Sequence, residues 1–404
     1  MSSRVLVINA GSSSLKYSLI DGISGEAAAS GLVERIGEPS GQQVHRGPQG
    51  EVRTSLEIAT HEDALRAVLN AFSSHGPSFD GVVAIGHRVV HGGSRFGDPV
   101  LIDDEMVAAV TELVPLAPLH NPANLEGIRV ARRLFPQLPQ VAVFDTAFHQ
   151  TLPPEAYTYA VALDWRDDHG VRRYGFHGTS HAFVSAEAAR LLGRSSGEVN
   201  LIVLHLGNGC SATAVRGGVS VDTSMGMTPL EGLVMGTRSG DLDPAIHAYL
   251  VRELGWSLED VDHALNHSSG LKGLAGQNDF RELDARRAAG DPHAQLAFDI
   301  YCYRIKKYVG AYYATLGTVD AIVFTAGVGQ NSAPVRSASL TGLERLGINL
   351  DADRNLAGAL TISTDDSPVA VLVIPTNEEW QIARETLALL HENKPCLLGV
   401  AEGG

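Results

Sequence analysis

The chain has 404 residues, with 31 Lys and Arg against 46 Asp and Glu, and so carries a formal net charge of -15. This length predicts about two or three domains, and a composition of 44% hydrophobic and 19% charged residues is typical of a globular protein with a sizeable core. The negative charge argues against nucleic acid or an anionic membrane as the main partner, because the basic residues cluster only in pairs and Coulomb repulsion would oppose binding.

The cysteines and the first residues point to a reducing environment. Cys210, Cys302 and Cys396 form no CxxC pair and are too few to staple a chain of this length. The apolar run Val5–Ile8 is too short for the hydrophobic region of a signal peptide, and no uninterrupted apolar stretch reaches about 18 residues. We therefore expect a cytoplasmic protein.

The chain opens with a pattern that is later repeated. A strand at 5–8, a Gly/Ser loop at 9–14 and a second strand at 15–20 are predicted first. The same order of strand, glycine loop and strand returns at 201–215, and a Gly-Gly turn at 217–218 leads into a further strand. This repetition indicates an internal duplication.

A second pair of segments supports the duplication. An apolar strand at 80–85 runs into the glycine-containing loop 86–93, and a strand at 320–324 runs into the loop 325–331. Two related α/β halves with a cleft between them are the natural interpretation, with the boundary after Asp145.

Helical patterns alternate with these strands. The best-marked helix starts at Asn121, which we expect to be the N-cap because Pro122 follows it. The segment 38–50 is rich in polar residues and glycine and is predicted to be a loop. The predicted helices cover 61–73, 103–113, 121–135, 179–192, 257–266, 293–316 and 377–391.

Several common motifs can be excluded. No GxxxxGK[ST] sequence occurs, which removes a P-loop nucleotidase. The GxSxG match at 193–197 follows a predicted helix and precedes a strand, the reverse of a nucleophile elbow. The GxGxxA match at 207–212 is followed by β-type residues instead of the helix that a dinucleotide fold requires.

Zinc is also not expected. His87 and His91, like His177 and His181, stand four residues apart, but neither pair has the Glu of HExxH. What remains are Gly- and Ser-rich loops after strands, where successive backbone N–H groups and serine hydroxyls can hold a phosphate. Two such loops in a duplicated setting favour a phosphate clamp.

The motifs together resemble the acetate kinase family, in order and over essentially the whole chain. They are VLVINAGSSSLKY at 5–17, GHRVVHGG at 86–93, FDTAFH at 144–149, RYGFHGTSH at 173–181, HLGNG at 205–209, GTRSGDLDP at 236–244 and PTNEE at 375–379.

The resemblance implies an α/β fold made of duplicated, ribonuclease-H-like domains of the actin and sugar-kinase type, with the active site in the interdomain cleft. One domain would cover 1–147 plus a C-terminal helix at about 383–404, and the nucleotide-binding domain would cover 148–382. The implied reaction is reversible, Mg²⁺-dependent (Mn²⁺ serving as well) phosphoryl transfer from ATP to acetate, giving acetyl phosphate and ADP. A homodimer is implied too.

The resemblance also assigns the charged residues. Arg88 and Arg238 would each present a planar guanidinium to carboxylate or phosphoryl oxygens, with Arg88 also binding the substrate, and His177 would donate to the equatorial oxygens of the transferring group. Asp145 would be an essential carboxylate that orients acetate, an arginine or the metal shell rather than removing a proton. Asn9 and Glu378, which Glu379 follows, would be linked to Mg²⁺, whose preferred ligands are hard oxygen atoms.

Further residues are assigned to nucleotide and acetate. A small pocket around the acetate methyl would contain Val90, Leu119, His120, Phe176 and Pro229. Gln330 stands where the family pattern leads us to expect Glu, which affects any charge-dependent ribose contact. The implied nucleotide-binding residues are Ser12, Lys16, His205, Leu206, Gly207, Asn208, Gly209, Asp279, Phe280, Arg281, Gly327, Val328, Gly329, Gln330 and Asn331.

Two alternatives stay open from the sequence. One is a kinase of the same family that acts on propionate or butyrate, although Val90 favours acetate. The other is a non-catalytic ATP-binding protein of the actin superfamily, in which Arg88, His177 and Arg238 would have no evident use.

Overall fold

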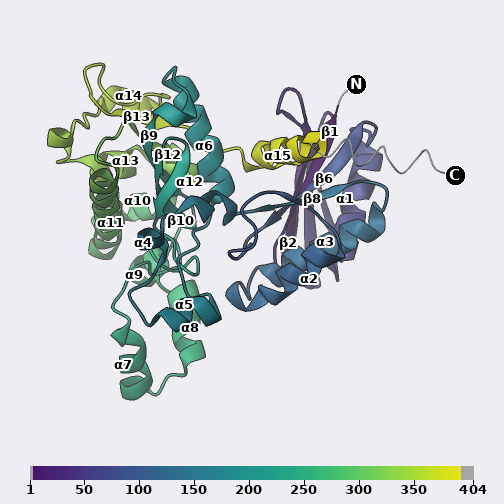
Figure 1. Ribbon diagram of the computed structural model, residues 1–404, viewed down its shortest axis with the longest axis horizontal. Coiled ribbons are helices and arrows are strands. Elements are labelled where there is room, and N and C mark those ends of the chain that lie inside the picture. The colour runs from purple at the N-terminus through teal and green to yellow at the C-terminus, as the bar shows by residue number, and fades with distance from the viewer. Residues whose placement is uncertain (1–2, 393–404) are drawn as a thin grey trace. The chain divides into compact units, whose positions relative to one another are not determined.

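The computed structural model describes residues 3–392, which divide into two compact units (Figure 1). The first unit contains the described residues up to Ala147 together with those from Asn377 onward, and the second runs from Phe148 to Thr376. The chain therefore returns to the first unit just before its last helix, not within that helix at 382. Residues 393–404 of the C-terminal segment that the family resemblance implies lie outside the described residues.

The first unit is built on an eight-stranded sheet with the order β5-β4-β3-β2-β1-β6-β8-β7. Its strands are β1 (Arg4–Ala10), β2 (Ser14–Asp21), β3 (Ala27–Glu34), β4 (Gly41–Gly47), β5 (Gly50–Leu56), β6 (Val82–Val89), β7 (Val100–Leu101) and β8 (Gln140–Phe144). Its helices are α1 (His61–His75), α2 (Asp104–Glu112), the 3₁₀ turn η1 (Val114–Leu116), α3 (Asn121–Leu134) and α15 (Glu378–Glu392).

The second unit is built on a five-stranded sheet with the order β11-β10-β9-β12-β13. The strands are β9 (Asn200–Leu206), β10 (Cys210–Arg216), β11 (Val219–Thr223), β12 (Ala321–Thr325) and β13 (Ala370–Val373). The α-helices are α4 (Pro154–Tyr157), α5 (Leu163–His169), α6 (Gly178–Leu191), α7 (Ala245–Leu254), α8 (Leu258–His267), α9 (Gly270–Ala275), α10 (Phe280–Ala288), α11 (Pro292–Leu316), α12 (Ala326–Asn331), α13 (Ala333–Leu340) and α14 (Ala352–Ala357). The 3₁₀ turns are η2 (Ala147–Thr151), which begins at the boundary, η3 (Ser196–Glu198) and η4 (Glu344–Leu346).

The two sheets share a common five-stranded core. In the first unit β3, β2 and β1 pair antiparallel, and β1, β6 and β8 pair parallel. In the second unit β11, β10 and β9 pair antiparallel, and β9, β12 and β13 pair parallel. The same order and the same directions confirm the duplication that the sequence predicted.

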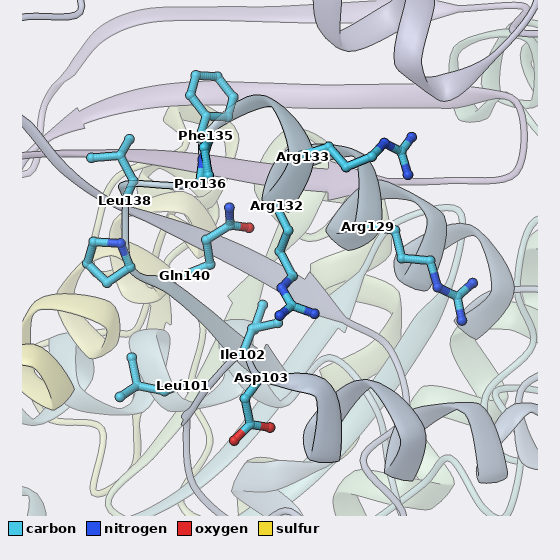
Figure 2. A pocket seen from close by; sticks show the side chains of 11 residues that line it. Leu101, Ile102, Asp103, Arg129, Arg132, Arg133, Phe135, Pro136, Leu138 and Gln140 are labelled. Atoms are coloured by element: carbon cyan, nitrogen blue, oxygen red, sulfur yellow. The ribbon is translucent and has the colours of Figure 1, made fainter.

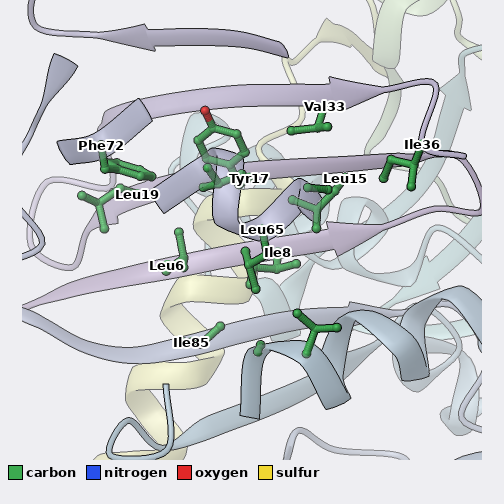
Figure 3. Close-up of a cluster of buried hydrophobic side chains, with 14 of the residues drawn as sticks. Leu6, Ile8, Leu15, Tyr17, Leu19, Val33, Ile36, Leu65, Phe72 and Ile85 are labelled. Carbon is green, nitrogen blue, oxygen red and sulfur yellow. The ribbon is translucent and has the colours of Figure 1, made fainter. Parts of the chain in front are cut away.

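Alternation along β1 explains how the first sheet is covered on both faces. Leu6 and Ile8 point to one face, where they join a buried cluster with α1 and α3 (Figure 3). Val5 and Val7 point to the other face, where they pack with Ile382 and its neighbours on α15. A strand that is apolar on both sides is typical of a sheet buried between helices.

The last helix approaches the sheet closely. A Cβ atom at Gly86 in β6 would lie 2.7 Å from Thr386 Oγ1 and 2.7 Å from Ile382 Cγ2, both on α15. Only glycine permits this contact. It holds α15, and with it the residues at the start of that helix, against the strand that carries Arg88.

Several local predictions were wrong. Residues 325–331 were predicted as a loop but contain helix α12, and strand β6 continues to Val89, into the predicted loop 86–93. Residues 38–50 contain the strand β4, whose Val44 and His45 are buried, so this segment belongs to the sheet despite its polar composition. Helix α3 has His120 as its N-cap, with no side-chain cap hydrogen bond, and Asn121 is the first helical residue. The Asn121 side chain instead binds the backbone of His91, as described below.

The excluded motifs behave as their surroundings indicated. The segment 193–197 connects helix α6 to strand β9, and residues 210–216 after the GxGxxA match form strand β10. Among the described residues, no helix is long and apolar enough to span a membrane.

The buried His87 makes stability depend on pH. Burial lowers the pKa of His87 to about 4, although a hydrogen bond with Gln140 at 2.8 Å opposes this shift. The unfolded chain therefore binds a proton that the folded chain excludes as the pH falls from about 6.5 toward 4. We expect His87 to account for a loss of roughly 3 kcal/mol of unfolding free energy over this range, measurable by urea unfolding at several pH values.

Two variants separate the causes of this loss. His87→Gln should reduce the slope of unfolding free energy against pH, whereas Gln140→Leu should lower stability at every pH and retain the slope. An unchanged slope in His87→Gln would show that other groups cause the acid sensitivity.

Candidate functional site

Arg88 and Asp145 form an ion pair at the carboxyl ends of two neighbouring parallel strands. Arg88 lies near the end of β6 and Asp145 follows β8 directly, so strand pairing places them side by side. Arg88 Nε donates to Asp145 Oδ1 at 3.1 Å, and Arg88 Nη2 donates to Asp145 Oδ2. Asp145 is only 1% exposed, which makes this a bidentate pair with a buried carboxylate.

Two further oxygen-bearing side chains reach the same guanidinium. Arg88 Nη1 lies 3.4 Å from Asn9 Oδ1, and Arg88 Nε lies 3.8 Å from Glu378 Oε2. Burial opposes the charge on Arg88, but Asp145 and Glu378 outweigh it and raise the pKa of the guanidinium. The structure therefore places three predicted residues of the first unit, Asp145, Asn9 and Glu378, around the predicted Arg88.

The predicted nucleotide-binding residues of the first unit lie at the same end of the sheet. Lys16 is the register partner of Asn9 across β1 and β2, and its ammonium group pairs with Glu379. Its side chain is half exposed, so this pair contributes little stability. Ser12 is exposed in the turn between β1 and β2.

Residues that the sequence did not single out fix the loop after β6. Asn124 Oδ1 accepts from Val90 N at 3.0 Å, and Asn124 Nδ2 donates to Ala10 O at 2.7 Å. Asn121 Oδ1 accepts from His91 N, and Asn121 Nδ2 donates to His91 O. Helix α3 thereby ties together the loops that follow β1 and β6. The only signal in the sequence was Asn121 itself, to which we had assigned a capping role.

In the second unit, His177 and Arg238 converge above a glycine. A Cβ atom at Gly209 would lie 3.4 Å from His177 Nε2 and 3.5 Å from Arg238 Nη1. His177 has the left-handed backbone conformation, with φ of 58°, at the N-cap of α6. A non-glycine residue in this conformation is under strain, which commonly marks functional positions. The imidazole and the guanidinium thus flank one point over the loop after β9.

Arg238 has no counter-charge in the described part of the second unit. Its Nη1 is 3.4 Å from Pro229 O and 4.0 Å from Met235 Sδ, and no carboxylate forms an ion pair with it. Burial lowers the pKa of this guanidinium. A half-buried cation without an anion is costly unless a ligand supplies the negative charge.

Three predicted nucleotide-binding segments of the second unit surround one cavity of about 530 Å³. Gly207 and Asn208 come from the loop after β9, and Asn208 Oδ1 accepts from Asn278 Nδ2 at 3.0 Å. The other segments are the start of α10 and the start of α12. The cavity is lined by Gly207, Asn208, Asn278, Asp279, Phe280, Arg281, Asp284, Gly327, Val328, Asn331 and Ser332.

Gln330 does not line this cavity, and its backbone carbonyl accepts a hydrogen bond from a buried arginine. Arg336 is 1% exposed and donates through Nη1 to Gly329 O at 2.9 Å and to Gln330 O at 2.7 Å. Its Nε donates to Asn355 Oδ1. Arg336, which the sequence did not reveal, therefore fixes the C-terminal carbonyl groups of α12.

The residues expected around acetate divide between the units. In the first unit Val90 is buried, Leu119 is 54% exposed, and His120 is the N-cap of α3. In the second unit Phe176 is buried, and the carbonyl of Pro229 contacts Arg238.

A second cavity, of about 750 Å³, lies at the other end of β8 (Figure 2). Figure 2 shows Arg132 reaching from α3 toward Ile102 and Asp103. Arg132 pairs with Asp104 and Arg133 pairs with Glu62, so carboxylates neutralise most of the positive charge in the wall of this cavity. Gln140 in its wall opens β8, whereas Asp145 follows the last residue of that strand. This cavity is therefore distinct from the cluster around Arg88.

Comparisons with known proteins agree with this geometry. Residues 4–384 match the model of the acetokinase family. The acetate kinase of Streptomyces coelicolor is 57% identical over 97% of this chain and 98% of its own length. A crystal structure of Porphyromonas gingivalis acetate kinase matches with a TM-score of 0.92 and 44% identity, covering 96% of this chain and all of the other. A Francisella tularensis propionate kinase matches with a TM-score of 0.91 and 44% identity, covering 95% and 98%.

Removing one partner of the Arg88–Asp145 pair should strongly destabilise the first unit. Asp145→Ala leaves a largely buried cation without its main partner, which costs about 3–5 kcal/mol. Urea unfolding would measure this loss through the fluorescence of Trp380 in a Trp165→Phe, Trp256→Phe background, because Trp380 is then the only tryptophan of the chain.

The matched control is the exposed pair of Arg95 and Glu105 in the same unit. Arg95→Ala should cost no more than about 1 kcal/mol. Equal losses in Asp145→Ala and Arg95→Ala would refute the stabilising role of the buried pair.

Proposed function

Because the chain belongs to the acetokinase family, we propose that it transfers the γ-phosphoryl group of ATP to acetate, reversibly and in line, giving acetyl phosphate and ADP. The observation that carries this proposal is the uncompensated Arg238 guanidinium beside His177 Nε2 over Gly209. Such a pair of donors suits a group that gains negative charge on its equatorial oxygens.

Acetate needs no general base. A carboxylic acid with a pKa of about 4 is already ionised at neutral pH, so its oxygen can attack the γ-phosphorus directly. The bond between phosphorus and the β,γ-bridging oxygen breaks, and its electron pair leaves with ADP. The barrier is the repulsion between two anions, and catalysis therefore rests on positioning and on cationic stabilisation.

In this mechanism Arg88 binds the acetate carboxylate and Asp145 orients Arg88. Both Asp145 oxygens accept from the guanidinium, which fixes the plane of the fork and leaves Arg88 Nη1 directed toward Asn9. An orienting carboxylate fits this geometry better than a proton acceptor does, because ion pairing favours its charged form.

The donors around Arg88 also fit Mg²⁺. The amide oxygen of Asn9 and the carboxylate of Glu378 are hard oxygen ligands, and the described residues contain no group of three or more His, Cys, Asp or Glu that could hold a metal by itself. Mg²⁺ commonly binds through one or two protein oxygens, with water and phosphate oxygens completing the shell. When bound, the ion would neutralise phosphate charge. Mn²⁺ would fit the same donors.

Nucleotide binding is proposed for the second unit. The cavity lined by Asn208, Asp279–Arg281 and the start of α12 offers backbone N–H groups and an aromatic ring for the nucleoside, and Lys16 and Ser12 in the first unit would contact phosphate. The half-exposed Lys16 has to exchange its pairing with Glu379 for such a contact.

Acetate is preferred over longer acids in this proposal because Val90 narrows the pocket at the end of β6. Propionate is the second candidate substrate, since a propionate kinase has nearly the same TM-score as an acetate kinase. One methylene in an apolar pocket changes kcat/KM by roughly 10- to 200-fold, so propionate would be a poorer substrate and not an excluded one.

The purified chain with ATP, Mg²⁺ and acetate should form an acyl phosphate that hydroxylamine converts to a hydroxamate. Chelation of Mg²⁺ should abolish the product. Faster turnover of propionate at limiting substrate would move the assignment to propionate kinase, and no product from acetate to butyrate would leave a non-catalytic ATP-binding protein.

Arg238→Ala tests whether the guanidinium beside His177 stabilises the transferring phosphoryl group. It should lower kcat by on the order of 100-fold or more and leave ATP affinity nearly unchanged. Arg190→Ala removes an exposed arginine paired with Glu187 on α6 and serves as the control. Loss of ATP binding alone in Arg238→Ala would contradict the proposed role.

A homodimer is proposed as well, and helix α7 supports it. Among the described residues α7 buries none of its side chains, although Ile246, Tyr249, Val251 and Leu254 are apolar and 37–57% exposed. An apolar helix surface of this kind is typical of a contact with another chain.

The few cysteines and the use of ATP favour the cytoplasm.

Size-exclusion chromatography with light scattering would test the dimer. The wild type should have the mass of two chains, and Tyr249→Glu with Leu254→Glu should shift it to one. Leu356→Glu changes an equally apolar, exposed residue on α14 and should leave the dimer intact. A monomeric wild type would refute the proposal.

A further inference from the structure

Two histidines of α6 share one buried serine. Ser211 Oγ lies 2.9 Å from His177 Nδ1 and 2.7 Å from His181 Nε2. Ser211 is in β10, where it is the register partner of His205 in β9, and it is fully buried. A serine hydroxyl has one proton and two acceptor lone pairs, so it could also accept from both imidazoles. Its own proton would then be buried with no third partner among the described residues. Ser211 therefore donates to one imidazole and accepts from the other. The two hydrogen bonds that link His181, Ser211 and His177 can therefore donate in only two ways: from His181 toward His177, or from His177 toward His181.

The surroundings of His181 decide between these directions. His181 is fully buried, and its Nδ1 has no hydrogen-bond partner among the described residues. If His177 donated to Ser211, Ser211 would donate to His181 Nε2, and the His181 proton would sit on Nδ1 as a buried N–H without an acceptor. Buried N–H groups without a partner are rare because their desolvation is not repaid. The opposite direction leaves no such donor.

We propose that Ser211 and His181 are positioning residues that fix His177 as the neutral tautomer with its proton on Nε2. His181 Nε2–H donates to Ser211, and the Ser211 hydroxyl donates to His177 Nδ1. This inference rests on the proposed function, since Nε2–H is the group that His177 directs toward the point above Gly209 shared with Arg238. Ser211 and His181 themselves do not touch the reacting atoms.

Charges in the neighbourhood agree with a neutral chain. Burial lowers the pKa of His181 well below its usual value, and the nearby His149 and His205 act in the same direction. Protonated His177 would have to donate from Nδ1 and reverse the whole chain, while adding a second positive charge beside Arg238. His205 stacks on His177 with ring centroids 4.2 Å apart.

His177 combines the hydrogen bond from Ser211 with a left-handed backbone conformation. His177 and His181 stand four residues apart, and His181 N donates to His177 O at 2.9 Å in the first turn of α6. With φ of 58°, His177 lies at the N-cap, and its ring and that of His181 both reach the same serine oxygen. The strained backbone of His177 thus carries an imidazole that the Nδ1 hydrogen bond with Ser211 holds in place.

Nitrogen-15 NMR of the whole protein labelled at histidine would test the tautomer without relying on activity. The 16 histidines are distinguished by substitution, and the two-bond ¹H–¹⁵N correlations show which nitrogen carries the proton. We expect neutral His177 to show a bare Nδ1 and a protonated Nε2 near pH 8, where an imidazole of ordinary pKa carries no charge. A proton on Nδ1, or a doubly protonated ring at neutral pH, would overturn the inference.

Ser211→Ala tests the consequence for catalysis. It should lower kcat roughly 10- to 100-fold with little change in KM for ATP or acetate, and should let His177 populate both tautomers. Ser185→Ala removes another buried hydroxyl of the same unit, one that has no hydrogen-bond partner in the described part of the chain, and should change neither readout. Wild-type kcat in a folded Ser211→Ala variant would overturn the inference.

The outcomes separate this inference from the proposed function. If the wild type forms no acyl phosphate but His177 carries its proton on Nε2, the proposed function fails and the tautomer assignment stands. If the wild type is active and His177 has its proton on Nδ1, the reverse holds. If Ser211→Ala does not fold, the wild-type spectrum alone still decides.

Discussion

The burial of positive charge is the constraint on which both units depend. Arg88 is 80% removed from solvent, and its charge persists because both oxygens of Asp145 lie against it while Asn9 and Glu378 approach from other sides. Removing one partner of such a pair costs far more than the pair adds in net stability. Several independent contacts therefore fix the position of Arg88. Asn124 and Asn121 hold the loop after β6, and Gly86 lets α15 approach the sheet and bring Glu378 close.

In the second unit the partly buried cation, Arg238, has no ion pair with a carboxylate among the described residues, in contrast to Arg88. Among the described residues Arg238 contacts a backbone carbonyl and a thioether in place of a carboxylate, and burial lowers the pKa of His149 and His181 in the same unit. A site of this kind keeps its attraction for an incoming anion, because no internal charge has already neutralised the guanidinium. On a chain with a net charge of -15, this local imbalance would favour the polyanionic ligand of the proposed function.

Sequence reasoning reached the features that depend on local pattern and missed those that depend on register. The apolar strands and the glycine loops at 9–14 and 207–211 were sufficient to predict the duplication, because strands buried on both faces leave a clear signal. Strand β4 was missed since its residues are mostly polar, and Asn121 was misassigned because a cap and a loop anchor have the same amide. The contact of Ser211 with two histidines requires both the β9–β10 register and the first turn of α6, which no spacing in the sequence shows.

The duplicated topology explains how one scaffold supports two kinds of chemistry. In the first unit the ends of β1, β6 and β8 carry Asn9, Arg88 and Asp145; the corresponding ends of β9, β12 and β13 carry the loop 207–209, Gly327 and Thr376. Parallel strands present their carboxyl ends along one edge, so equivalent positions are equally placed for a ligand. In the proposed function, charged side chains there would bind a carboxylate and a metal, whereas glycine would leave backbone N–H groups open to phosphate. Divergence at these three strand ends, with the pairing of the strands unchanged, is sufficient to give the two units different roles.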